Sequence, residues 1–337
     1  MNFTISYIFR KPDPKYRSIE GLFNHLEEIV GLRIKTKKIN LNFSGGSPKA
    51  LWLNLKSFKK GDDKIYHITG DVQYMGIVTG RKSVLTVHDV KSIVKGSFIK
   101  RMYMKLFWFW LPALFVNRIT VISEFTKKEL EKMIPFAKDK IKVVHNPVNP
   151  IFEFSAYHFN QIKPRVLLLG TKPNKNLNRV LESLKGVHCE VILIGQPTQE
   201  QEDFATKCEI DITYKFNLDI EKVVTEYQAC DLLCFVSTYE GFGMPIIEAQ
   251  SVGRPVITSN LGAMKEVAAD TALLVNPWDI EAIRAGILQI IEDEKLRDVL
   301  VQRGLQNVER FSVETIAKHY TDIYEEVGGK SNMMNFG

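Results

Sequence analysis

Two glutamates and two glycines stand close together around residue 240, in the stretch EGFGMPIIE. Glu240 and Glu248 have seven residues between them, and Gly241 and Gly243 lie in that interval. A carboxylate accepts paired hydrogen bonds from vicinal hydroxyls, so such a pair suits a sugar or a ribose. Glycine lets the main chain approach a ligand with no Cβ in the way. The pattern indicates a site for a hydroxyl-rich ligand; a tight turn followed by a solvated helix face is the open alternative.

The elements expected around these residues place them together. The apolar run 232–236 predicts a buried strand. Pro245 suits the first turn of a helix that stops at Gly253, and 255–259 predicts the next strand. The loop 237–244 therefore leaves a strand and enters a helix, so its free N–H groups and the helix dipole suit a phosphate. Both carboxylates can face the crevice at the carboxyl end of the strand.

The same stretch resembles the signature of the retaining glycosyltransferases of family 4. The motif E-G-F-G-M-P-x-x-E-A is preceded by D-L-L-C-F-V-S and followed by G-x-P-V-I-T-S-N. The likeness is specific over most of 166–327 and looser in the first half. It implies an α/β GT-B fold, in which two Rossmann-like open parallel-sheet domains face each other across a cleft. It also implies a nucleotide-diphosphate sugar as donor.

The resemblance assigns roles to the residues of the glutamate stretch. Glu248 would hold the ribose hydroxyls of the donor, and Glu240 would contact the donor sugar as a catalytic residue. The main-chain N–H groups of the loop would contact the same sugar. The loop residues expected to bind the donor are Gly241, Phe242, Gly243 and Met244.

A second loop, 170–177, follows the strand predicted for 166–169. The family carries a lysine before an asparagine here to bind the donor diphosphate, and Lys175 matches it. The family usually has an arginine directly after the glycine, whereas this chain has Thr171. Lys172 could supply the second charge, or the diphosphate relies on fewer charges. Without the resemblance, a lysine pair in such a loop is most often solvated.

In the first half, the strand predicted for 84–87 ends at His88. The resemblance implies that His88 contacts the donor sugar near the reacting carbon, with Asp89 orienting the ring. A histidine bonded locally to Asp89 is the alternative. His67 and Asp71, which end the previous strand, are further candidates to line the same cleft.

The loop after the first strand is basic and departs from the family pattern. Pro12, Asp13, Pro14 and Lys15 stand where the family usually carries a glycine-rich turn on the acceptor side. Such a loop could meet a phosphate-bearing acceptor, or it is a solvated turn.

The segment 91–118 combines six basic residues with a cluster of Phe, Tyr, Trp and Met. One interpretation is a long helix buried against the sheet, with its basic side chains reaching water. The other adds contact with an anionic membrane surface, with aromatic side chains at headgroup level. Both interpretations stay open on the sequence alone.

The amino-acid composition limits the class of protein, its partners and its location. The chain has 337 residues, 45% of them hydrophobic and 25% charged, which is typical of a soluble globular protein of two domains. The net charge of +6 favours anionic partners such as nucleotide phosphates or a membrane face; nucleic acid is not expected. The four cysteines form no C-x-x-C pair, so buried free thiols are expected, with no metal site and no cofactor. The start of the chain lacks a signal-peptide pattern, and no apolar run is long enough for a spanning helix. A cytoplasmic location, or a peripheral one at the inner membrane face, is expected.

Strand–loop–helix units recur in both halves, which predicts two domains. The first comprises 1–150 on the acceptor side and is completed by the C-terminal helix 312–330. The second comprises 165–311 and binds the nucleotide sugar. A linker without periodicity, containing HNPVNP, joins them.

The function expected from these features is a retaining, metal-independent glycosyltransferase. It would move a sugar from a UDP- or GDP-sugar to a glycan or lipid-linked saccharide during cell-surface polysaccharide synthesis. The alternatives are a GT-B epimerase or phosphorylase, or a non-catalytic subunit that binds the nucleotide sugar, for which Thr171 is the only support. A dinucleotide dehydrogenase is disfavoured because no G-x-G-x-x-G follows the first strand.

Overall fold

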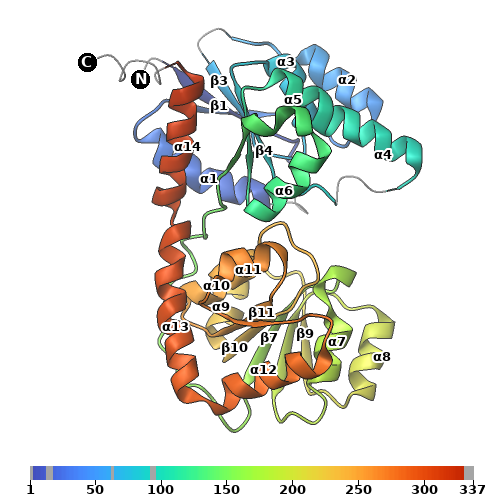
Figure 1. Cartoon of the computed structure of the whole chain (residues 1–337), viewed down its shortest axis with the longest axis vertical. Helices are drawn as coiled ribbons and strands as arrows, with labels where there is room; N and C mark the ends of the chain where they lie inside the picture. Colours follow the sequence, from blue (N-terminus) through green and yellow to red (C-terminus); the bar gives the residue numbers. More distant parts are fainter. Residues whose placement is uncertain (1–2, 13–17, 62–63, 92–95, 330–337) are drawn as a thin grey trace. The chain divides into compact units, whose positions relative to one another are not determined.

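The computed structural model describes residues 3–12, 18–61, 64–91 and 96–329. The chain divides into two compact units (Figure 1). One unit comprises residues 1–147 and 313–337, and the other comprises residues 148–312. Each unit is an α/β fold built on its own sheet.

The first unit holds a parallel sheet of six strands within its described residues, in the order β2-β1-β3-β4-β5-β6. The strands are β1 (Thr4–Phe9), β2 (Thr36–Asn40), β3 (Lys64–Ile68), β4 (Ser83–Val87), β5 (Arg118–Val121) and β6 (Ile141–Val143). The main helices are α1 (Ser18–Gly31), α2 (Pro48–Ser57), α3 (Gly76–Thr79), α4 (Phe98–Met104), α5 (Leu111–Phe115), α6 (Glu124–Met133) and α14 (Val313–Val327).

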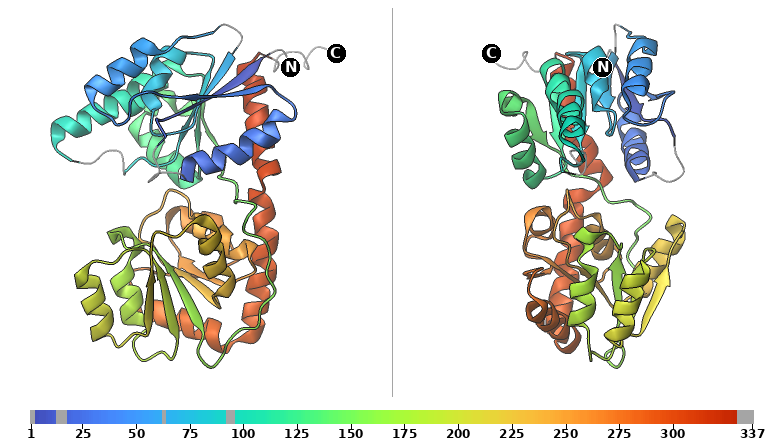
Figure 2. Two further views of the ribbon diagram at one scale, coloured as in Figure 1. Left: turned by 180° about the vertical axis from the view of Figure 1, so that it is seen from behind. Right: turned by 90° about the vertical axis from the view of Figure 1, so that its right-hand side faces the viewer.

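Two hydrophobic layers cover the faces of this sheet. On one face α1 packs beside α14 (Figure 2). Their apolar side chains meet Ile5, Tyr7 and Val84. On the other face the aromatic pair Trp108 and Phe109 packs with residues of α2, α5 and α6. Strands buried on both faces read as continuous apolar runs, which is why the sequence shows them clearly.

A buried polar network fixes α14 to the sheet. His67 lies in β3 with no exposed surface; one ring nitrogen is 2.6 Å from the Tyr324 hydroxyl and the other is 2.7 Å from Thr86 Oγ1. Burial lowers the pKa of His67 to about 3, and the nearby His88 ring contributes to the shift. The expectation that His67 lines a ligand cleft is therefore wrong, because the side chain points under the sheet toward α14.

The second unit holds another parallel sheet of six strands among its described residues, in the order β12-β11-β10-β7-β8-β9. The strands are β7 (Arg165–Leu169), β8 (Glu190–Ile194), β9 (Ile212–Lys215), β10 (Leu232–Phe235), β11 (Val256–Ser259) and β12 (Leu273–Val275). The main helices are α7 (Leu177–Ser183), α8 (Gln199–Lys207), α9 (Ile220–Ala229), α10 (Met244–Ser251), α11 (Gly262–Ala268), α12 (Ile280–Glu292) and α13 (Glu294–Val308).

Local signals account for most of these elements. Ser123 and Asp279 cap α6 and α12 with side-chain hydrogen bonds, as is typical of these residue types at helix starts. Pro245 occupies the first turn of α10. Residues 32–41 are a strand candidate in the sequence, but β2 is shorter, because Leu32 is exposed in the turn after α1 and pairing starts at Thr36. The helices α2, α8 and α13 were not anticipated.

The aromatic segment is not one long helix. The described part comprises α4, a π-helical turn at Lys105–Trp110 (η2) and α5. The Leu111 N–H bonds to the Leu106 carbonyl five residues back, just before Pro112, which has no N–H to continue the ladder. Residues of α4 are not buried, whereas Trp108, Phe109 and Ala113 lie in the core. The core interpretation therefore holds from the end of α4 onward, where Tyr103 and Met104 also pack against the core.

Candidate active site

In the second unit, the strand order indicates where on the sheet a ligand would bind. The strand order runs outward from β7 through β8 and β9 on one side, and from β10 through β11 and β12 on the other. The carboxyl ends of β7 and β10 are thus the switch point of the sheet, where open α/β sheets bind ligands. The loop after β7 carries Lys175, and the loop after β10 carries Glu240.

These two side chains form an ion pair across the switch point. Lys175 Nζ lies 2.7 Å from Glu240 Oε1, and both side chains are mostly buried, with exposed fractions of 19% and 18%. Lys175 Nζ also lies 4.6 Å from the centre of the Phe235 ring. A cation and a carboxylate that are partly shielded from water attract each other more strongly than a fully exposed pair. The site therefore presents a positive and a negative group side by side.

Asn174 joins the two loops and was not identified from the sequence. Its side-chain amide donates to Glu240 Oε1 at 3.1 Å and to the Tyr239 carbonyl at 3.0 Å. Its own carbonyl accepts from the Thr238 N–H at 2.8 Å. Nothing in the sequence pattern distinguished this asparagine from other loop residues, because its partners are 64 to 66 positions away.

Gly170 makes room for the lysine. Its φ of +81° lies in the left-handed region, and a Cβ there would come 3.1 Å from the Cγ and Cε atoms of Lys175. The aliphatic stem of Lys175 lies against this glycine, and the ammonium group extends to Glu240. Any larger residue at 170 would displace the stem.

Glu248 lies in α10 and is held from a different helix. Tyr227 of α9 donates its hydroxyl hydrogen to Glu248 Oε2 over 2.6 Å. Burial raises the pKa of Glu248 to about 7, against the opposing influence of the Tyr227 hydrogen bond and the Lys175 charge. The sequence showed Tyr227 only as part of an apolar helical stripe, so its contact with the carboxylate was missed.

The glycine loop leads into the N-terminus of α10. Gly243 has a φ of +120°, and a Cβ there would lie 3.1 Å from Ile246 Cδ1. The Phe242 ring is buried edge-on against Phe311, with the ring centres 5.6 Å apart, so a ligand at the site can meet only its main chain. Gly241 and Met244 are partly exposed on either side. This geometry directs main-chain groups and the helix dipole toward the switch point.

Thr171 and Lys172 lie in the same loop as Lys175 but make different contacts. Thr171 Oγ1 donates to the Gln196 carbonyl at 2.9 Å, and the Thr171 carbonyl accepts from the Gln201 amide at 2.9 Å. The polar groups of Thr171 are thus used within the fold. Lys172 is exposed and carries its charge in solvent.

In the first unit, His88 follows β4 and lies over Gly70. Its Nε2 donates to the Thr69 carbonyl at 2.7 Å, so the neutral ring carries its proton on Nε2 and leaves Nδ1 as an acceptor. Burial lowers the pKa of His88, which the Thr69 hydrogen bond and the Asp71 charge oppose. A Cβ on Gly70, whose φ is +140°, would lie only 2.8 Å from His88 Cδ2. The Thr69 carbonyl and Gly70 together fix the ring.

A charged cluster surrounds this histidine at the carboxyl ends of β1 and β3. Arg10 Nε donates to Glu20 at 2.8 Å, and its Nη1 lies 2.5 Å from Asp71. Arg10 and Glu20 both influence the charge state of His88. The neighbouring sites expected at Asp13, Pro14 and Lys15 lie outside the described residues, and Pro12 is exposed at the edge of them.

Metal ligands, cysteines and membrane-spanning helices were further possibilities, and each can be assessed in the part of the chain that the structure describes. No three His, Cys, Asp or Glu side chains in it are grouped so as to hold a metal ion. The four cysteines, all in this part, are buried and free, as expected, and burial raises the pKa of Cys189 to about 11. No described helix has the length and apolar character needed to span a bilayer.

Two family models match the chain. Residues 28–151 match "Glycosyltransferase Family 4", and residues 155–307 match "Glycosyl transferases group 1". The two matched regions together take in most of the sequence.

Curated relatives are similar at modest identity. O-antigen chain mannosyltransferase B of Escherichia coli is 28% identical over 61% of this chain and 60% of its own length. O-antigen chain mannosyltransferase RfbU of Salmonella typhimurium is 26% identical over 65% of this chain and 63% of its own length. The matched region thus spans a little under two thirds of these relatives.

Solved structures share the fold over nearly the whole chain. A glycosyltransferase from Rickettsia africae superposes with a TM-score of 0.73 at 17% identity and covers 98% of this chain and 100% of its own. The HepE protein of Anabaena, solved in complex with UDP-glucose, superposes with a TM-score of 0.74 at 15% identity and covers 96% of this chain and 99% of its own. The expected GT-B architecture is confirmed by these superpositions and by the two parallel sheets.

Proposed function

Since this chain belongs to glycosyltransferase family 4, we propose that it transfers a sugar from a nucleotide-diphosphate sugar to a saccharide acceptor. The donor is UDP- or GDP-linked, and the acceptor is a glycan or lipid-linked saccharide of a cell-surface polysaccharide. The names of the two O-antigen relatives favour mannosyl transfer. The reaction takes place in the cytoplasm.

One observation carries this proposal: the Lys175–Glu240 pair lies at the switch point of the second sheet. A nucleotide sugar has a diphosphate that needs a cation and a sugar whose hydroxyls need an acceptor, and the pair offers both 2.7 Å apart. Glu248 supplies a further carboxylate for the ribose. Gly241, Phe242, Gly243 and Met244 contribute main-chain groups, and Lys172 supplies a second, solvent-exposed charge. The polar groups of Thr171 are bound within the fold, so this threonine only shapes the loop.

The same groups account for departure of the nucleoside diphosphate. Negative charge builds on the diphosphate oxygens as the bond to the sugar breaks. Lys175 and the N–H groups at the start of α10 stabilise that charge, which is why we propose that no metal ion is required. Transfer in the presence of excess EDTA tests this part of the proposal, and loss of activity would contradict it.

We propose that the anomeric configuration is retained and that Glu240 acts on the donor sugar as an electrostatic group. Its Oε1 is already shared between Lys175 and Asn174, which disfavours it as a nucleophile. His88 from the first unit contacts the sugar near the reacting carbon through the unprotonated Nδ1. The anomeric proton coupling of the product, read by NMR, distinguishes retention from inversion.

A donor screen tests the function as a whole. Thermal shift is measured with UDP-, GDP- and ADP-sugars, GDP-mannose included, followed by a transfer assay with the donor that binds. Glu248→Ala and Lys175→Ala should each abolish the shift. Lys163→Ala is the matched control, because Lys163 precedes β7 at the opposite end of the same strand and pairs with Asp211. Full donor affinity in both site variants would overturn the assignment.

We further propose that the exposed face of the aromatic segment contacts an anionic membrane. Phe98, Met102, Leu106, Trp110 and Leu114 recur every four residues and are each more than one third exposed. Exposed basic side chains, Lys100 and Arg101, stand beside them. Apolar side chains flanked by cations are the pattern of interfacial helices.

Vesicle flotation tests this contact. The chain should float with vesicles that contain phosphatidylglycerol and should remain behind with pure phosphatidylcholine. Phe98→Ser with Ile99→Ser should reduce flotation. Equal flotation of this variant, or equal binding to both lipids, would contradict the proposal.

A further inference from the structure

A tyrosine in the second unit controls the acid proposed to hold the ribose. The Tyr227 hydroxyl lies 2.6 Å from Glu248 Oε2, a short distance typical of a hydrogen bond to a carboxylate. Burial raises the pKa of Tyr227 well above its ordinary value, and the Glu248 charge adds to the shift. The hydroxyl therefore stays protonated and donates a hydrogen bond to the carboxylate. One of the two carboxylate oxygens is therefore engaged before any ligand arrives.

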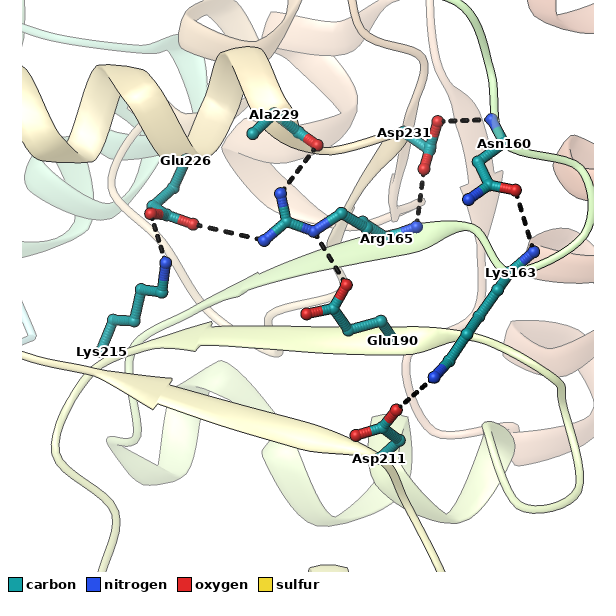
Figure 3. A network of polar contacts seen from close by, with 9 residues as sticks. All are labelled: Asn160, Lys163, Arg165, Glu190, Asp211, Lys215, Glu226, Ala229 and Asp231. Carbon is teal, nitrogen blue, oxygen red and sulfur yellow. Dashed lines mark hydrogen bonds and ion pairs between the residues drawn. The ribbon is translucent and has the colours of Figure 1, made fainter.

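The position of Tyr227 is itself fixed by its surroundings. The ring is 1% exposed and meets the Phe152 ring edge-on, with the ring centres 5.2 Å apart. The adjacent residue, Glu226, is held by Lys215 at 2.5 Å, and Arg165 approaches it at 3.9 Å (Figure 3). These contacts anchor α9 to β9 and β7. A helix fixed in this way holds the hydroxyl in one place.

Among the described residues, two side chains influence the pKa of Glu248 besides burial itself. From α9 the relevant group is Tyr227, and from the loop after β7 it is Lys175. From α13, which packs against α10, Gly304 and Asn307 approach Gln250, and both are uncharged. The buried residues of α11 are apolar. Tyr227 is thus the direct hydrogen-bond partner of the acid, and Lys175 acts on it through charge.

We propose that Tyr227 is a positioning residue that holds Glu248 by one oxygen so that the carboxylate faces the ribose hydroxyls of the donor. The inference rests on the proposed function, because it concerns the same site. Its physical basis is that a carboxylate with one oxygen fixed has lost its rotational freedom. The remaining lone pairs then point in one direction and match a vicinal diol with little further ordering.

The contact also sets the charge state of the acid. Glu248 accepts two hydroxyl hydrogens only as a carboxylate, and its pKa of about 7 means that it protonates as the pH falls through neutrality. The Tyr227 hydrogen bond lowers this pKa. Without the hydroxyl the pKa rises, so ribose recognition is lost at a higher pH than in the native chain.

The test is calorimetric titration of the full chain with UDP and GDP, and with their 2′-deoxy forms, between pH 6 and 9. Tyr227→Phe keeps the ring and removes the hydroxyl. Tyr157→Phe is the matched control, because Tyr157 is a partly buried tyrosine of the same unit whose hydroxyl donates to a main-chain carbonyl, that of Asp231, at 3.4 Å. The ratio of ribose to deoxyribose affinity cancels the titration of the nucleotide itself.

In Tyr227→Phe we expect that ratio to fall about tenfold at pH 7 and to recover only in part at pH 9, because the charge of Glu248 is restored there but its positioning is not; the midpoint should move up by about one pH unit. Tyr157→Phe should match the native chain. An unchanged ratio, or a loss equal at every pH and for both sugars, would overturn the inference while leaving the proposed function intact. If the native chain binds neither nucleotide, the proposed function fails and the inference fails with it. Glu248→Gln is the second variant, and a pH-dependent ratio in it would also overturn the inference.

Discussion

Lys175 and Glu240 contact each other at 2.7 Å, from loops that follow two neighbouring strands of one sheet. The cation proposed for the donor diphosphate is therefore already bound to the acid proposed for the donor sugar. A diphosphate that binds Lys175 must compete with this internal carboxylate. Removal of the carboxylate charge should therefore strengthen the binding of the diphosphate.

Glu240→Gln should bind UDP or GDP more tightly than the native chain while transferring sugar more slowly. The amide can still accept from Asn174, but it no longer neutralises Lys175 or repels the phosphates. We expect the dissociation constant of the nucleoside diphosphate to fall about fivefold, as expected for loss of a competing ion pair worth about 1 kcal/mol. Turnover should fall by at least about a hundredfold, because the sugar loses its electrostatic partner. Calorimetry and a transfer assay measure the two effects; weaker nucleotide binding would contradict the competition.

Gly70→Ala should impair turnover through His88. The added Cβ would lie 2.8 Å from the ring in a left-handed conformation, so the ring must shift from the Thr69 carbonyl. We expect turnover to fall about tenfold to a hundredfold, with nucleotide affinity unchanged. Gly21→Ala is the control, since a Cβ at Gly21 in α1 meets no atom within 4 Å and should stabilise the helix by about 0.5–1 kcal/mol. Equal activity of the two variants would remove His88 from the site.

Glu248→Gln should raise stability at alkaline pH. The folded chain raises the pKa of this carboxyl to about 7, from 4.5, so folding penalises its charged form. The penalty is absent below pH 4.5, grows between pH 4.5 and 7, and is complete above pH 7. The free energy of unfolding of the glutamine variant should therefore exceed that of the native chain by about 3 kcal/mol at pH 8 and equal it at pH 4. Denaturant unfolding at both pH values measures this, and equal stability at pH 8 would show that Glu248 is solvated.

Tyr324→Phe should destabilise the first unit without affecting nucleotide binding. The substitution leaves the buried His67 ring nitrogen without its 2.6 Å partner, which costs about 1–3 kcal/mol. Tyr214→Phe is the control, because Tyr214 is only partly buried in β9. Chemical unfolding and calorimetry separate the two effects. A change in nucleotide affinity of Tyr324→Phe, with stability unaltered, would contradict the structural role of the network.

The sequence was sufficient for the sheets and for the site residues that share a local motif. Buried parallel strands are apolar runs, so β4, β7, β10 and β11 were each predicted within one residue, and Pro245 is a chemical signal at the start of α10; the more exposed β2 was not placed as well. Glu240 and Glu248 were found because they lie in one short stretch.

What the sequence did not show depends on contacts between distant positions. Asn174 and Tyr227 act through partners 66 and 21 residues away; Asn174 belongs to no spacing pattern, and the helical stripe that contains Tyr227 indicates only a buried face. His67 was misassigned because a histidine at a strand end looks the same whether it faces a ligand or the underside of the sheet. Its partners Thr86 and Tyr324, 19 and 257 residues further on, hold the ring in its buried position.

The most direct measurement is a crystal structure of the chain soaked with UDP or GDP. We predict that the diphosphate lies within hydrogen-bond distance of Lys175 Nζ, that the ribose hydroxyls contact Glu248, and that the Lys175–Glu240 contact is opened or shared. A nucleotide bound elsewhere, or one whose ribose makes no contact with Glu248, would contradict it.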